Sequence, residues 1–212
     1  MLRVLFVLFA SSLLYKSAFS VAIVPINSLS NLDAEIANYI AMPAESEVQF
    51  EIDPGTYDIS TSFSTLGTVT SMTFVASSLV SSLPTDCESL PTITFSSGRF
   101  EFNSISQINF QGVSLIADGV SRIIDANSAL TIQFSYSCIV ESSSATTTDS
   151  FYYGSNPISF VSSVIIKNID APVFVINSAS FTWDDSIIYY QGSASSSKPV
   201  IFLHGSSATS DC

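Results

Sequence analysis

Short apolar segments in which every second residue is polar recur along most of this chain. Val48, Phe50 and Ile52 alternate with Gln49 and Glu51, and similar segments lie near residues 93–95, 100–102, 108–115, 130–134, 164–169, 173–175, 187–190 and 200–203. A period of two is typical of a β-strand with one buried face, and β-branched and aromatic residues fill most apolar positions. The pattern predicts an all-β protein of short strands.

One helix is expected near residue 36. Ser30 or Asn31 can cap its start, acidic residues lie in its first turn, and an apolar face runs from Leu32 to Ile40 before Pro43 ends it.

Two polar bends within the strand region suggest how the chain is wound. Residues 107–113 and 163–169 each read as a strand, a short bend containing Asn or Gly, and another strand, and residues 129–138 repeat this more loosely. Coils of about 20 to 25 residues that stack their apolar faces would form a solenoid. A parallel β-helix is therefore favoured, and an antiparallel β-sandwich remains the alternative.

The stretch from Leu32 to Ser60 resembles the N-terminal cap of pectin-lyase-like right-handed parallel β-helix proteins. The likeness rests on the helix, on the strand at 48–52 and on the turn Asp53-Pro54-Gly55-Thr56-Tyr57. It implies that the helix covers the end of a right-handed solenoid and that Tyr57 packs inward. Because the superfamily includes lyases, hydrolases, esterases and adhesins, the resemblance leaves the function open.

The first twenty residues are typical of an export signal. Arg3 precedes the apolar run from Val4 to Tyr15, and Ala18-Phe19-Ser20 offers small residues for cleavage. The run is shorter than the roughly 20 residues that span a bilayer, so membrane contact is expected only during export. We expect a signal peptide at 1–20, an N-terminal segment with the capping helix at 21–47, and a secreted β-helix domain at 48–212. Since no capping element precedes the end at Cys212, this domain is expected to be truncated.

Composition narrows the function. With 18 acidic and 6 basic residues among 212, a net charge of −12 argues against nucleic-acid binding. A single histidine and three cysteines exclude a four-thiolate zinc site, so no metal ligands are assigned, and calcium is expected only if the protein is a lyase. In an oxidising compartment Cys87 can pair with Cys138 and leave Cys212 over, but other pairings are equally allowed.

Candidate catalytic residues lie near the end of the chain. Asn168-Ile169-Asp170, Asp184-Asp185 and Leu203-His204-Gly205 occur in an order similar to motifs of polygalacturonase-type β-helix hydrolases. The resemblance implies Asp170, Asp184, Asp185 and His204 as catalytic groups. The chain departs from those motifs because Leu203 replaces a glycine and no Arg-Ile-Lys follows. The alternative is structural: the aspartate pair is a solvated turn, and His204 ends a strand.

Exposed aromatic rings would suit a sugar ligand. Trp183 and Tyr189 are the candidate ligand-binding residues, although inward aromatic rings of a solenoid form its core. We expect a secreted, non-catalytic protein with a structural, surface or adhesive role, bound to extracellular polysaccharide or cell-surface glycan. The alternative is a polysaccharide hydrolase or lyase.

Overall fold

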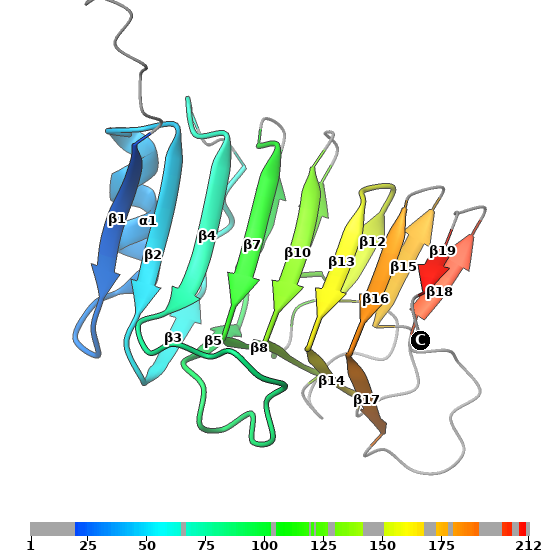
Figure 1. The fold of residues 1–212 in the computed structure, drawn as a ribbon. Helices are drawn as coiled ribbons and strands as arrows, with labels where there is room; N and C mark the ends of the chain where they lie inside the picture. Colours follow the sequence, from blue (N-terminus) through cyan, green and yellow to red (C-terminus); the bar gives the residue numbers. More distant parts are fainter. Residues whose placement is uncertain are drawn as a thin grey trace, which may run out of the picture.

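The chain winds into a parallel β-helix, whose described residues form three sheets and one short helix (Figure 1). The structure is a computed structural model, which describes residues 20–64, 67–102, 105–118, 120, 122–126, 130–141, 151–167, 173–177, 180–190, 201–204 and 208–210. Strand pairing between neighbouring coils is parallel throughout these residues. The predicted fold is thus confirmed, and the antiparallel sandwich is wrong.

Successive strands of the chain are divided among three sheets, and most coils contribute one strand to each. Sheet A contains, in spatial order, β1 (Val21–Ile26), β2 (Glu47–Ile52), β4 (Ser71–Ala76), β7 (Gln107–Gln111), β10 (Thr131–Ser135), β13 (Ile158–Val161), β16 (Phe181–Asp184) and β19 (Ala208–Ser210). Sheet B contains β3 (Thr56–Ile59), β5 (Thr92–Phe95), β8 (Ser114–Ala117), β11 (Cys138–Glu141), β14 (Val164–Lys167) and β17 (Ile187–Tyr190). Sheet C contains β6 (Phe100–Phe102), β9 (Ile124–Ala126), β12 (Tyr152–Gly154), β15 (Phe174–Asn177) and β18 (Ile201–His204).

A column of stacked aromatic rings forms the centre of the core behind sheet A. Phe50, Phe74, Phe110, Phe134 and Phe160 occupy equivalent positions of successive strands, and their ring centroids lie 5.3, 5.3, 5.4 and 5.0 Å apart. Every one of these rings is fully buried. Offset stacking of this kind adds to the energy of burial, so the same residue type at the same point of each coil keeps the coils in register.

The aromatic column also measures the coils. Successive phenylalanines are 24, 36, 24 and 26 residues apart in sequence, from Phe50↔Phe74 through Phe74↔Phe110 and Phe110↔Phe134 to Phe134↔Phe160. The one long coil contains a loop between β4 and β5, and we call its residues 78–90 the strap. This serine-rich stretch contains neither a helix nor a strand.

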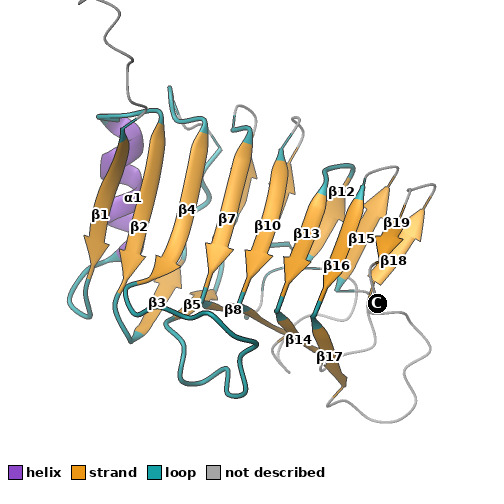
Figure 2. Ribbon diagram, in the orientation of Figure 1, coloured by secondary structure: helices purple, strands orange, loops and turns teal. Residues whose placement is uncertain are grey.

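Helix α1 (Leu32–Ala41) lies between β1 and β2 in sequence and behind β1 in space (Figure 2). Asn31 caps it by accepting a hydrogen bond from the backbone N–H of Ala34, and Leu32 and Ile36 are buried. Asp33 ties the helix to the coil, because its Oδ2 accepts hydrogen bonds from the Ser60 N–H and hydroxyl. The expected cap is therefore present at the β1 end of the stack.

The N-terminal segment contains one element that the sequence pattern missed. Residues 21–26 form β1, which pairs in parallel with β2 and begins sheet A. The first coil therefore has a strand in sheet A, with the helix in the part of the coil that later coils use for sheets B and C.

Candidate functional site

Uncharged polar side chains make up most of the outer surface of sheet A from β4 to β13, with Val75 and Val161 among them. In its middle column Gln49, Thr73, Asn109, Gln133, Ser159 and Thr182 occupy equivalent positions of β2, β4, β7, β10, β13 and β16. We call this column and the outward residues beside it in the same strands the polar face. Neighbouring strands lie about 4.8 Å apart, so the column presents one amide or hydroxyl at each such step.

Hydrogen bonds within the polar face hold its amide groups in place. The Gln107 side-chain amide donates to Asn109 Oδ1 at 3.1 Å, and the Asn109 amide donates to Thr73 Oγ1 on the preceding coil at 3.2 Å. One coil further on, the Gln133 amide donates to Ser135 Oγ at 3.1 Å. These groups are partly buried against their neighbours, so their side chains already have few rotamers. A ligand that binds them would therefore cost less conformational entropy.

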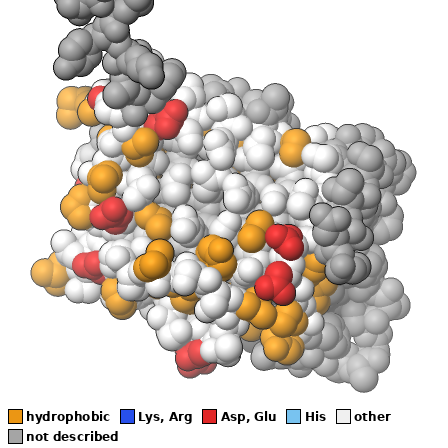
Figure 3. Space-filling view, viewed as in Figure 1, with side chains coloured by type: hydrophobic (Ala, Val, Ile, Leu, Met, Phe, Trp, Pro, Cys, Tyr) orange, Lys and Arg blue, Asp and Glu red, His pale blue; other side chains and the backbone are white. Residues whose placement is uncertain are grey.

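Charge is confined to the two ends of the polar face. Glu47 and Glu51 point outward from β2, and Asp184 ends β16, whereas the described outward side chains of β4, β7, β10 and β13 include no charged group. Figure 3 views this surface and shows a wide uncharged region between acidic groups. A basic group that would neutralise an acidic ligand is missing from the described strands of this face.

The aspartate pair lies at the corner between sheets A and B. Asp185 has a φ of 44°, and Gly112, Tyr136 and Ser162 have φ values of 65°, 53° and 45° at the same corner of preceding coils. Both aspartate side chains are exposed, and the backbone carbonyl of Asp184 accepts a hydrogen bond from the Ser162 N–H at 2.9 Å. The described contacts of the pair are thus those of a left-handed bend between strands.

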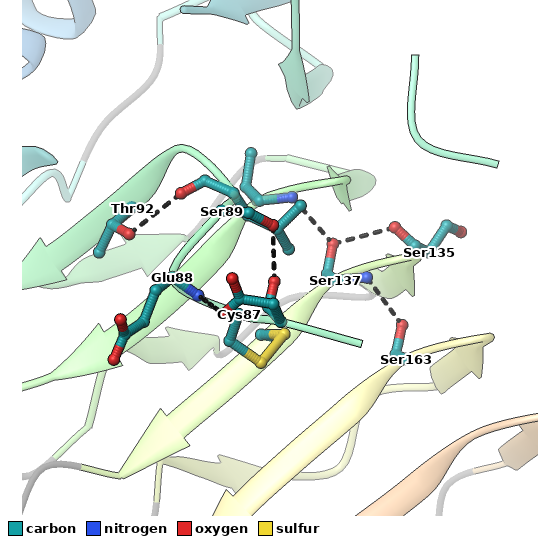
Figure 4. The surroundings of a disulfide bond; sticks show 11 residues. Cys87, Glu88, Ser89, Thr92, Ser135, Ser137 and Ser163 are labelled. Atoms are coloured by element: carbon teal, nitrogen blue, oxygen red, sulfur yellow. Dashed lines mark hydrogen bonds between the residues drawn. A yellow bond between two sulfur atoms is a disulfide. The ribbon is translucent and has the colours of Figure 1, made fainter. Parts of the chain in front are cut away.

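A ladder of three serines follows this bend, and sequence reasoning missed it. Ser163 Oγ accepts from the Ser137 N–H and donates to the Val161 carbonyl, and Ser186 Oγ accepts from the Ser163 N–H and donates to the Asp184 carbonyl. Ser137 similarly joins Val113 to its own coil (Figure 4). We call Ser137, Ser163 and Ser186 the serine ladder. Its signal is a serine directly after the bend residue in three successive coils.

The four candidate catalytic residues are not all placed together. Asp170 and the side chain of His204 lie outside the described residues. The backbone of His204 ends β18 in sheet C, just before the chain enters sheet A at β19, whose Ala208 pairs with Phe181. Asp184 lies at the other end of β16, about 10 Å from Phe181 at 3.3 Å per residue. The aspartate pair therefore lies at one end of the sheet A strands. The strand that carries His204 leads into the other end.

The two aromatic candidates face different ways. The ring of Trp183 continues the core column, 5.4 Å from Phe160, and its indole N–H donates to the Ser186 carbonyl at 3.1 Å. Tyr189 points outward from sheet B in register with Ile166 and is 53% exposed. The two rings consequently do not form one aromatic platform.

Cys87 of the strap is bonded to Cys138 of β11, with Cα atoms 5.7 Å apart (Figure 4). This is one of the pairings that the sequence left open, and Cys212 lies outside the described residues. Within the described part of the chain, no three His, Cys, Asp or Glu side chains gather closely enough to hold a metal ion. The same residues include no helix that is long and apolar enough to span a membrane.

Comparison with known proteins finds no match to the chain among protein-family models, curated proteins or solved structures.

Proposed function

We propose that this protein is an exported, non-catalytic binding protein that attaches to extracellular carbohydrate through the polar face. The observation that carries the proposal is the column of amide and hydroxyl side chains that continues uninterrupted from Gln49 to Thr182. Amides and hydroxyls both donate and accept, so they match the hydroxyl groups of a sugar. The export signal expected at residues 1–20 puts the protein where such polymers occur.

The acidic charge of the protein favours an uncharged polysaccharide as the ligand. The chain carries a net charge of −12, and carboxylates lie at both ends of the polar face. An acidic polymer would meet like charge at both ends of the polar face, without a lysine or arginine in the described face to offset it. A neutral glycan chain laid across the coils avoids this repulsion.

The geometry offers less support for the alternative of a polysaccharide hydrolase or lyase. Among the candidate catalytic carboxylates, the structure describes only Asp184 and Asp185, which are adjacent and exposed at one bend. Acid–base catalysis on a glycosidic bond instead needs two carboxyls placed on either side of that bond. The polar face needs no catalytic group, which is why a binding role is favoured.

The test is a binding measurement on two matched variants. Asn109→Ala with Gln133→Ala removes two neighbouring amides of the polar face, and we expect about tenfold weaker binding to neutral polysaccharide, since two hydrogen bonds contribute on the order of 1.4 kcal/mol. Thr94→Ala removes an outward hydroxyl from sheet B and should bind like the unaltered protein.

The ligands for this experiment are one neutral and one acidic polysaccharide, each with and without calcium, and released sugars are measured in parallel. Equal binding by both variants would contradict the polar face as the site. Tighter binding to the acidic polymer would contradict the charge argument. Release of reducing ends by the unaltered protein would favour the enzyme.

A further inference from the structure

The strap is attached to the solenoid in a way that differs from the other described parts of the chain. Its described hydrogen bonds are local: the Glu88 N–H donates to Asp86 Oδ1, the Ser89 hydroxyl donates to the Asp86 carbonyl, and Thr92 bonds to the Leu90 carbonyl. Figure 1 shows it as a green loop that extends below the sheets. Its attachment to the coils comes from the Cys87–Cys138 disulfide and from apolar packing.

The apolar packing is a second cluster, separate from the main core. Leu90 of the strap, Cys138 and Val164 are buried together, and they are flanked by partly buried Val80 and Leu83 of the strap and by Val140 and Ile166 of sheet B. These sheet residues point outward from β11 and β14, so without the strap they would face water. The strap therefore covers an apolar strip on the outside of sheet B.

We propose that the strap is a thiol-releasable cover over this strip. The bond closes a loop with a sequence separation of 51 residues, and without it the contacts described between the strap and the coils are those of the apolar cluster. The strap is not part of the stacked core. The aromatic column lies inside the solenoid, whereas the strap packs on the outer face of sheet B. Reduction is expected to open the strap and leave the β-helix folded.

The reductant is a small-molecule thiol, and the reaction is thiol–disulfide exchange. Cys138 is fully buried, whereas Cys87 is partly exposed, so the thiolate attacks the Cys87 sulfur. A mixed disulfide forms at Cys87, and Cys138 leaves as a thiolate that takes a proton from solvent. A second thiol attacks the mixed disulfide, which frees the Cys87 thiol and gives the oxidised dimer of the small thiol.

The experiment measures the accessibility of Cys138 after reduction of the full chain with glutathione. Alkylation of each cysteine is followed by mass spectrometry, with circular dichroism as the measure of the fold. We expect Cys138 to be alkylated within about tenfold of the Cys87 rate while the β-sheet signal is unchanged, because local opening exposes it. Protection of Cys138 far beyond that ratio would overturn the proposal, and so would loss of the β-sheet signal.

Two leucine variants separate strap opening from general destabilisation. Leu83 packs against the apolar cluster, and Leu83→Ser should speed reduction of the disulfide several-fold because the closed strap is weakened. Leu79 is 87% exposed in the same loop, and Leu79→Ser should leave the rate unchanged. Equal rates for the two variants would show that the strap does not open as a unit. Cys212→Ser serves as a background in which no third thiol can exchange.

Discussion

Gly112 lies at the first of the left-handed bends between sheets A and B, and it also lies under the strap. Its φ is 65°, and a Cβ atom there would come within 2.9 Å of Val80 Cγ2. A side chain at this position would therefore be strained in its backbone and would push Val80 away from its seat.

Gly112→Ala should lower the free energy of unfolding by about 2 to 3 kcal/mol, measured by urea denaturation. Gly67→Ala is the matched control, because Gly67 also has a left-handed φ, of 56°, but the nearest described atom to its Cβ would be the Ile40 carbonyl oxygen at 3.5 Å. The control should cost about 1 kcal/mol, for the backbone conformation alone. Equal losses would mean that contact with Val80 does not matter.

We expect Tyr152 to make the stability of the protein sensitive to alkaline pH. The ring is buried, and its hydroxyl donates to Asn156 Oδ1 at 2.8 Å. Burial raises the pKa of Tyr152 to about 12, the hydrogen bond from the Asn156 backbone opposes this, and the Asp125 charge adds to it. In the unfolded chain the tyrosine pKa is about 10.

The neutral phenol of Tyr152 therefore contributes stability that is complete below pH 10 and is lost as the pH rises towards 12. Urea midpoints measured from pH 8 to pH 12 should be level at first and then fall. Tyr152→Phe should be less stable at pH 8, because the hydrogen bonds with Asn156 are gone, and should show a shallower alkaline fall. A fall of the same steepness in the variant would place the alkaline sensitivity elsewhere, for example at Tyr57, whose pKa burial also raises.

At the scale of elements, the serine ladder joins one coil to the next at the bend between sheets A and B. Strand pairing does not join the coils at this bend. Ser163 is fully buried and bonds both to the Ser137 N–H and to its own coil. Removing its hydroxyl leaves that N–H buried without this acceptor, which is more costly than losing an exposed hydrogen bond.

Ser163→Ala should reduce the free energy of unfolding by about 1 to 3 kcal/mol. Ser159→Ala, four residues earlier on the polar face, is the control and should change it by less than about 0.5 kcal/mol. Chemical denaturation of both variants checks the difference, and a similar effect at the two sites would argue against a special role for the ladder.

Strands were predictable where inward and outward residues differ in character, and β1 shows why that rule fails at an edge. Its outward residues Val21 and Ile23 are apolar although 45% and 59% exposed, so no alternation marks the strand. Pro25 also argues against a strand, yet it is tolerated here. The Ile26 carbonyl faces β2, where it accepts from the Asp53 N–H, so the backbone of Pro25, one residue earlier, faces away from β2. Its missing N–H falls on the side where no described strand pairs.

For the whole molecule, the stacked architecture followed from the sequence because each coil repeats the same apolar positions and because the cap region carries its own helix and turn signals. Long-range contacts that break the repeat could not be predicted in the same way. Cys87 and Cys138 meet only because the loop before β5 folds back over β11, two coils further on. The polar face was equally hidden, because its residues look like ordinary solvated positions until stacking aligns them.

The long coil shows how tolerant the scaffold is of added sequence. Its 36 residues exceed the 24 of the preceding coil by 12, and still Phe74 stacks on Phe110 at the same 5.3 Å as on Phe50. Length added at that corner is thus absorbed outside the stack. An unrelated peptide of similar size, closed by a cysteine at the same point, could be displayed there in a constrained form, which makes this corner a natural place for grafting epitopes.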